Sequence, residues 1–217
     1  IRPDVLLGTG YRRTQTLCRG QDRMHEDIMR FPSRWFYHDE LEAAPEVKYR
    51  GILDFDTPVS WIDTSELDLQ EKAVAEGTGR LNTGEAELLV RELKNYMERI
   101  GIRRILEEHI DFGVISPYRA QVHYLRHLLK KEPFFRPCRR LITVHTVDGF
   151  QGQERDVIMI SLVRANEKGQ IGFLRDLRRM NVAITRARMK LLILGEAVTL
   201  TRHPFYRELY EYIGGLR

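Results

Sequence analysis

The chain has 217 residues, 42% of them hydrophobic, which is enough to bury one core of single-domain size. Lysine and arginine outnumber aspartate and glutamate by only 35 to 31, so the charge permits an anionic partner without requiring one. The two cysteines fit neither a disulfide framework nor a metal site, and no apolar run approaches the roughly 18 residues of a membrane span; we therefore expect an intracellular protein, cytoplasmic or nuclear, with no metal site and no membrane contact.

The N-terminal part of the chain is the least regular. Residues 1–20 show no period and form an unplaced lead-in, so we expect one domain at 21–217. By themselves, the segment 21–25 (Gln-Asp-Arg-Met-His) and the aromatic run that follows it favour a structural histidine and a packed core over a catalytic histidine and a base-stacking platform. Residues 59–62 predict a short strand, and the polar stretch 63–80 predicts a loop.

A helix start is marked by Asn82 and Glu85, which form a capping-box pattern. The Asn82 side chain can accept from first-turn amides, while Glu85 reaches back to the amide of Asn82. Apolar residues then recur at steps of three and four: Ala86, Leu89, Val90, Leu93, Met97 and Ile100. Because Gly101 supplies a stop signal, we expect a helix between Asn82 and Gly101 with one face on a core.

Strands and helices alternate through the rest of the chain. Apolar runs rich in β-branched residues predict strands at 112–116, 141–144, 157–163 and 190–194. Apolar positions at helical spacing predict helices at 118–131, 174–188 and 204–213. This alternation is typical of an α/β domain with a mostly parallel sheet.

Ligands of such sheets bind beyond the carboxyl ends of the strands, and the connection 145–156 is unusually polar for a loop between two buried strands. Its glycines allow backbone amides to approach a phosphate or a ribose closely, and Glu154 can accept hydrogen bonds from ribose hydroxyls. The alternative is a long polar loop that carries a salt bridge.

The segment 178–188 is rich in arginine. On the predicted helix, Arg179 and Arg186 lie about two turns apart on one side, where they can reach into a cleft. A guanidinium suits a developing phosphoryl charge because its planar fork donates two parallel hydrogen bonds and keeps its proton. The alternative is a set of helix-face charges that pair with acidic neighbours.

In their order and in their residue sequences, these segments resemble superfamily 1 helicases of the nonsense-mediated-decay helicase group over roughly residues 21–214. The family's Gln-Tyr-Arg-Met-His motif is matched at 21–25, Ser/Thr-Pro-Tyr at 116–118, Val-Asp-x-Phe-Gln-Gly-x-Glu at 147–154, and Asn-Val-Ala-x-Thr-Arg-Ala-Arg at 181–188. The resemblance implies the second RecA-like motor domain, a three-layer α/β fold of the P-loop NTPase type.

The resemblance also implies roles for the matched side chains. Arg186 and Arg23 are expected to act as catalytic arginines that reach across to a triphosphate. The other expected nucleotide-binding positions are Glu154, Gly152, Gln151 and Arg179. The expected strand-contacting positions are Ser116, Tyr118 and Thr146. Asp22 replaces the family's aromatic residue that is expected to stack on adenine, so base selectivity is expected to be looser.

The sequence contains no Gly-x-x-x-x-Gly-Lys-Ser/Thr loop and no acidic pair placed to hold magnesium. ATP and Mg²⁺ are therefore expected on a first RecA-like domain outside this sequence, in an ATP-dependent helicase or translocase that moves on single-stranded DNA or RNA. The isolated chain is expected to be inactive. The alternative is a degenerate helicase-like module that binds nucleic acid or regulates without ATP turnover. Asp22 favours that module, whereas the joint presence of Arg23, Glu154 and Arg186 favours the motor.

Overall fold

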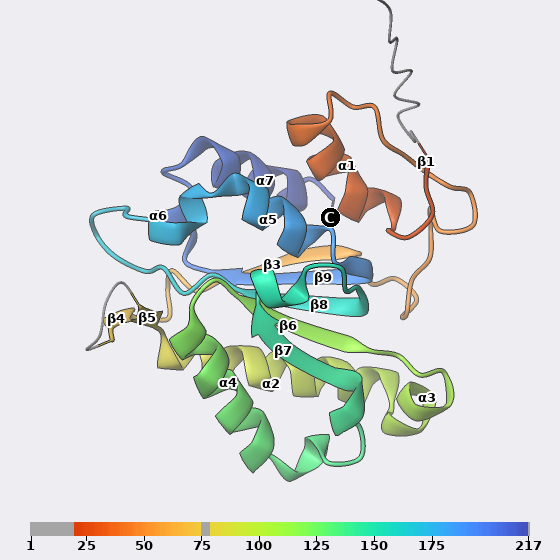
Figure 1. Cartoon of the computed structure of the whole chain (residues 1–217), viewed down its shortest axis with the longest axis horizontal. Coiled ribbons are helices and arrows are strands. Elements are labelled where there is room, and N and C mark those ends of the chain that lie inside the picture. Colours follow the sequence, from red (N-terminus) through yellow and green to blue (C-terminus); the bar gives the residue numbers. More distant parts are fainter. Residues whose placement is uncertain (1–19, 75–78, 217) are drawn as a thin grey trace, which may run out of the picture.

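A five-stranded sheet forms the centre of the computed structural model, which describes residues 20–74 and 79–216 (Figure 1). The strands are β3 (Val59–Asp63), β6 (Phe112–Ser116), β7 (Ile142–Thr146), β8 (Arg155–Ser161) and β9 (Ala187–Gly195). They are all parallel and lie in the order β3-β9-β8-β6-β7. The three central strands are buried almost throughout because helices cover both faces. The predicted α/β class is confirmed.

Helices on both faces give the fold three layers (Figure 1). One face carries α1 (Glu26–Phe36), α5 (Leu177–Ile184), α6 (Ala197–Leu200) and α7 (Pro204–Gly214). The other carries α2 (Thr83–Ile100), α3 (Ile102–Glu107) and α4 (Arg119–Lys131). An apolar core lies between the sheet and each helical layer. The core under α1, α5, α6 and α7 includes Phe31, Phe150 and Phe205, and the core under α2, α3 and α4 includes Leu89 and Leu125.

Short elements complete the described structure. β1 (Gly20–Gln21) pairs in parallel with β2 (Glu42–Ala43), and β4 (Lys72–Ala73) pairs antiparallel with β5 (Arg80–Leu81). The 3₁₀ turns are η1 (Pro133–Phe135), η2 (Arg139–Leu141), η3 (Asp148–Phe150) and η4 (Gly172–Arg175). The predicted loop 63–80 thus contains β4, while residues 1–19 of the predicted lead-in lie outside the described residues. None of the described helices is long and apolar enough to cross a membrane.

The helix α2 begins and ends where the sequence predicts. The Asn82 side chain accepts a hydrogen bond of 3.0 Å from the Glu85 amide, and Gly101 follows the last turn with φ 89°. The second half of the predicted capping box is wrong. The amide of Asn82 donates instead to Gln121 at 2.9 Å, and the Glu85 carboxyl group turns to Ser161 of β8 at 2.6 Å.

The predicted helix at 174–188 is wrong in length, because α5 spans only Leu177–Ile184. Asp176 caps its start, and the Thr185 hydroxyl donates to the last turn at its end. From Ala187 onward the chain pairs with β8, and this strand pairing overrides the helical period of the apolar residues. Arg179 therefore lies in the first turn of α5 and Arg186 beyond its end, so the two arginines do not share a helix face as predicted.

The two ends of the parallel sheet present different residues. At the carboxyl end of the sheet the strands finish at Asp63, Ser116, Thr146, Ser161 and Gly195. The connection 147–154 leaves β7 at this end and enters β8 at the opposite, amino end, so it has to cross the face of the sheet. Glu154 therefore lies at the amino end of the sheet, and not beyond the carboxyl ends of the strands where the sequence analysis places the polar residues of this connection.

Candidate sites at the two ends of the sheet

An arginine cluster lies at the amino end of the sheet. It consists of Arg23 before α1, Glu154 before β8 and Arg186 before β9. Nη1 of Arg23 lies 3.5 Å from Oε2 of Glu154, and the charges of both act on Arg186. The amide of His25 donates to the carbonyl of Arg188 at 2.8 Å, which fastens the segment before α1 to β9. Three segments that are far apart in the sequence therefore meet at one place.

Arg186 is held in this cluster by uncharged acceptors. Its guanidinium donates to the carbonyls of Val182 and Gln153, at 3.0 and 3.2 Å, and to the Thr185 hydroxyl at 3.2 Å. Among the described residues no carboxylate lies within 4.0 Å of it. Burial, and next the charge of Arg23, lowers the pKa of Arg186, yet an arginine stays protonated in proteins. The cluster thus holds a positive charge that a bound anion would stabilise.

Arg188, in the same motif, has the opposite character. Its guanidinium lies 3.0 Å from Asp111, 3.1 Å from Asp156 and 3.8 Å from Glu154. These carboxylates match its charge and join the starts of β8 and β9 to the residue before β6. Arg188 is therefore committed to the structure, and Arg186 is the arginine that remains available to a ligand.

The connection 147–154 is anchored by Phe150. The ring of this buried residue packs over Gly113 of β6, where a Cβ atom would lie 2.8 Å from the ring carbon Cζ. Beyond the anchor, Gln151 and Gly152 are exposed, and Gly152 has φ 78°, which favours glycine. This exposed pair leads to Glu154, so the connection joins the carboxyl end of β7 to the arginine cluster.

Arg179 is not part of the arginine cluster. Its guanidinium pairs with Asp148 at 3.4 Å and with Asp176 at 3.5 Å. Together with Thr146 it lines a small cavity near the carboxyl end of β7. The prediction that Arg179 stands beside Arg186 is therefore wrong, because the helix that would align them ends between them.

The three predicted strand contacts at the carboxyl end of the sheet differ in exposure. Ser116 is 0% exposed because it ends β6 inside the sheet, and Tyr118 is 2% exposed because its ring packs against Phe173 with centroids 5.5 Å apart. Thr146, at the end of the outermost strand β7, is half-buried. Of the three predicted residues, only Thr146 therefore presents a surface to a strand in this conformation.

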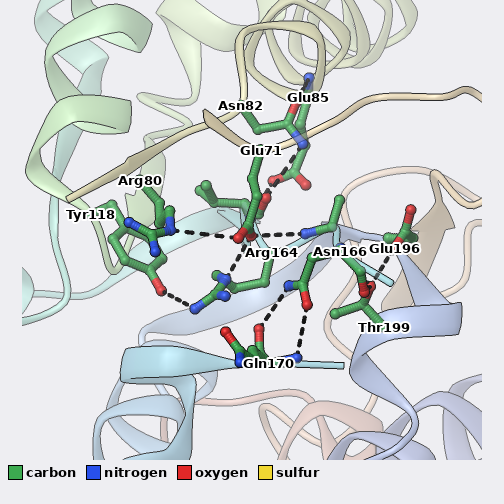
Figure 2. A network of polar contacts seen from close by, with 12 residues as sticks. Glu71, Arg80, Asn82, Glu85, Tyr118, Arg164, Asn166, Gln170, Glu196 and Thr199 are labelled. Carbon is green, nitrogen blue, oxygen red and sulfur yellow. Dashed lines mark hydrogen bonds and ion pairs between the residues drawn. The ribbon is translucent and has the colours of Figure 1, made fainter. Parts of the chain in front are cut away.

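An arginine that the sequence does not single out, Arg164, lies beside Tyr118 (Figure 2). Its Nη1 donates to the Tyr118 hydroxyl at 3.3 Å and its Nε to Glu71 at 2.6 Å. Glu71 also lies 3.5 Å from Arg80. Glu71 and Arg164 are 93 residues apart in the sequence, so no local pattern could have revealed the pair. This network lies just beyond the carboxyl end of β8.

The chain reaches Arg164 through a strained turn at Val163. Its φ of 70° is rare for a β-branched residue, and such backbone persists only where the surroundings hold it. The Val163 amide donates to Glu85 at 2.8 Å, and its carbonyl accepts from the Asn82 side chain at 3.3 Å. The two residues predicted to form a helix cap thus also clamp this turn and direct the chain into Arg164.

Comparison with known proteins agrees with the order of the motifs. A family model described as an AAA domain matches residues 6–198. The chain is 39% identical over 199 residues to DNA polymerase alpha-associated DNA helicase A of Saccharomyces cerevisiae, covering 84% of the chain and 28% of that protein. It is 36% identical over 200 residues to Probable helicase MAGATAMA 3 of Arabidopsis thaliana, covering 90% and 24%. It is 34% identical over 198 residues to a Regulator of nonsense transcripts 1 homolog of Neurospora crassa, covering 87% and 17%. The chain thus spans less than a third of each of these relatives.

Proposed function

This chain belongs to the AAA domain family, as the C-terminal RecA-like domain of a superfamily 1 helicase, and from that premise we propose that it supplies one half of an ATP site. The phosphate loop and the magnesium ligands belong, in this proposal, to a first motor domain that closes on the amino end of the sheet. Together the two domains form an intracellular ATP-dependent helicase or translocase.

The unmatched charge of Arg186 carries this proposal. Its guanidinium is partly withdrawn from water and held by three hydrogen bonds. A cation fixed in such surroundings stabilises the charge that develops on a transferred phosphoryl group without first having to reorganise. The planar fork can donate to two phosphate oxygens at once. Arg186 therefore acts as an arginine finger in the proposed site.

Arg23 and Glu154 complete the half-site. Their side chains are 56% and 34% exposed, so Arg23 can turn to a phosphate and Glu154 can accept from the ribose hydroxyls. Gln151 and Gly152, exposed on the crossing connection, lie between this site and the carboxyl end of the sheet. Asp22 is exposed and offers no ring to an adenine, so we expect weak selection among nucleotide bases.

Single-stranded DNA or RNA is the second proposed ligand, at the carboxyl end of the sheet. In this proposal the Thr146 hydroxyl contacts a strand phosphate, while the buried Ser116, which lies beside Thr146 in the register of β6 and β7, and the buried Tyr118 act indirectly. The crossing connection and α5 both run from this end toward the amino end. Closure around ATP can therefore shift the strand contacts, which is how a motor of this kind steps along a strand.

A regulatory or nucleic-acid-binding module without ATP turnover is the second candidate function. The exposed Asp22, in place of a stacking ring, is the observation that favours it. The state of Arg186 favours the motor instead. A partly buried arginine without a carboxylate partner lowers the stability of the fold. A domain that no longer binds a nucleotide would gain nothing from keeping such an arginine.

ATP hydrolysis by Arg186 variants tests the proposal. In the protein that joins this chain to a first motor domain, we expect Arg186→Ala to lower strand-stimulated turnover on the order of 10³-fold. Strand binding without nucleotide should stay unchanged. Arg186→Lys should restore little, because an ammonium group cannot reproduce two parallel hydrogen bonds. Melting temperatures should barely move, since Arg186 loses no carboxylate partner among the described residues.

Arg188→Ala is the matched control, because it removes the same charge two positions away. It breaks the ion pairs to Asp111 and Asp156 and should therefore lower the melting temperature. Near-normal turnover by Arg186→Ala would show that the arginine-finger assignment is wrong. Absence of turnover in the unaltered protein, with a phosphate loop present on the first domain, would favour the module.

A further inference from the structure

Three arginines and two aromatic rings line an open pocket of about 440 Å³ at the carboxyl end of the sheet. The arginines are Arg80, Arg164 and Arg175, and the rings belong to Tyr118 and Phe173. Its volume falls within the range of about 300–1,000 Å³ that is usual for ligand pockets. Part of the polar network of Figure 2, in which Glu71 contacts Arg80 and Arg164 and Arg164 donates to Tyr118, forms one wall of the pocket.

Arg164 gives the pocket a fixed cation. Its side chain is 5% exposed, and it is locked by Glu71 at Nε and by Tyr118 at Nη1. Its Nη2 has no hydrogen-bond partner among the residues that the structure describes. A guanidinium held in this way loses little rotamer freedom when it binds an anion. The free N–H groups therefore form a prepared anion contact.

The charge of the pocket is not balanced. Glu71 forms ion pairs with both Arg164, at 2.6 Å, and Arg80, at 3.5 Å. Within the described part of the chain no carboxylate lies within 4.0 Å of Arg175, which is exposed. Three positive charges thus face one negative charge. The pocket therefore attracts an anion, and the exposed side chain of Arg175 is accessible to it.

Phe173 adds an exposed ring to this cationic pocket. It is 45% exposed, and one side of it is supported by the Tyr118 ring at 5.5 Å. Gly172, with φ 54°, lets the chain pass Arg164 and Tyr118; a Cβ there would lie 2.8 Å from the Tyr118 hydroxyl and closer still to Nη1 of Arg164. The loop that carries Phe173 is therefore held close to the arginines.

An exposed ring next to several arginines matches a ligand that alternates flat bases with phosphates. In single strands the bases are free to stack on a protein ring, whereas in a duplex they stack on one another. We propose that this pocket holds one nucleotide of a bound single strand, with its base on Phe173 and its phosphate on Arg175 and Arg164. This inference rests on the strand binding proposed above and adds a subsite whose proposed ligand contacts, Phe173, Arg164 and Arg175, lie outside the motif segments matched in the sequence.

Strand affinity of the 217-residue chain tests the subsite. Fluorescence anisotropy with labelled oligo-dT and oligo-rU strands compares Phe173→Ala with Leu106→Ala, a matched loss of an exposed apolar side chain on α3. We expect Phe173→Ala to weaken binding about 5- to 100-fold, as loss of one stacked base does. Leu106→Ala should change nothing. The two oligonucleotides show whether the subsite separates DNA from RNA.

The phosphate contact has its own readout in the salt dependence. Arg175→Gln should lower the slope of log affinity against log salt by about 0.7, the value for one phosphate of a single strand. Arg103→Gln on α3, with the same change in charge, should leave the slope unaltered. Melting curves confirm folding, and both residues that are changed in the pocket are exposed.

The outcomes separate the two proposals. If the unaltered chain binds neither strand, the proposed strand binding is wrong and the subsite falls with it. If the unaltered chain binds a strand and neither Phe173→Ala nor Arg175→Gln has an effect, the subsite alone is wrong. Polyglutamate serves as a competitor of the strand. If it displaces the strand and its binding falls equally in Phe173→Ala and Arg175→Gln, the pocket binds an acidic peptide, and the proposed nucleotide subsite is wrong.

Discussion

Glu85 is a carboxyl group without contact to solvent. The Ser161 hydroxyl and the Val163 amide donate to its Oε1 at 2.6 and 2.8 Å, and its Oε2 has no hydrogen-bond partner among the described residues. Burial raises the pKa of Glu85 to about 7, although the two hydrogen bonds favour the charged form. Below neutral pH the folded protein therefore holds a proton at the clamp of the strained turn.

The raised pKa of Glu85 predicts a pH-dependent stability. In the unfolded chain this carboxyl has its ordinary pKa of 4.5, so between pH 4.5 and about 7 the folded state binds the extra proton. The free energy of unfolding should therefore fall as the pH rises through this window, by roughly 3 kcal/mol. Glu85→Gln should remove that contribution. Urea unfolding of both proteins from pH 4.5 to 8 measures the difference, and parallel curves would contradict the prediction.

At the scale of elements, the connection between β7 and β8 depends on close contact with the sheet. Phe150 can approach β6 closely because residue 113 is a glycine. A second close approach lies beside it, since a Cβ at Gly149 would overlap the His145 ring. These contacts hold the connection on the face of the sheet. They therefore fix the path of Gln151 and Gly152, which lead to Glu154 of the arginine cluster.

Gly113→Ala should loosen this connection. The added methyl would lie 2.5 Å from Cδ1 of Ile158 and 2.8 Å from the Phe150 ring, neither of which can move freely inside the core. Overpacking of this kind costs about 1–3 kcal/mol. Urea unfolding measures the loss, and Gly214→Ala at the end of α7, where a Cβ meets nothing within 4 Å, is the control. Equal stability of the two variants would show that the connection is not held by this contact.

At the scale of the whole molecule, the two proposed ligands lie at opposite ends of one parallel sheet. The arginine cluster is at the amino end, and the pocket around Phe173 is at the carboxyl end. Two packed cores, one on each face, join these ends into one unit (Figure 1). A change at one ligand can reach the other through the elements that cross the sheet, above all α5 and the connection 147–154.

The isolated chain should fold but hydrolyse no ATP. It offers Arg23, Glu154 and Arg186 to a nucleotide but contains no phosphate loop, so its affinity for ATP should be weak as well. Cooperative urea unfolding together with a phosphate-release assay, with and without a single strand, measures both expectations. Strand-stimulated turnover by the purified chain, free of contaminating ATPases, would contradict the half-site.

The sequence by itself predicted the order and type of the sheet strands and of α2, α4 and α7, but it predicted neither α1 nor α3. Periods of three to four residues and unbroken apolar runs are local, so α2, α4 and the strands of the sheet could be predicted within a few residues. The residue sequences of the motifs likewise identified the family, because the matched segments are long and specific. The start of α2 at Asn82 was also predictable, since a cap concerns neighbours along the chain.

Only the tertiary structure decided how the candidate residues are partnered. Arg186 and Arg188 look alike in the motif, but one meets neutral acceptors and the other meets carboxylates from distant segments. The helical period at 174–188 was real, yet pairing with β8 drew the chain into a strand at Ala187. Burial of Tyr118 and the pairing of Arg164 with Glu71 likewise depend on contacts between residues far apart in the sequence. Such contacts leave no local period, because they form only once the sheet has brought its connections together.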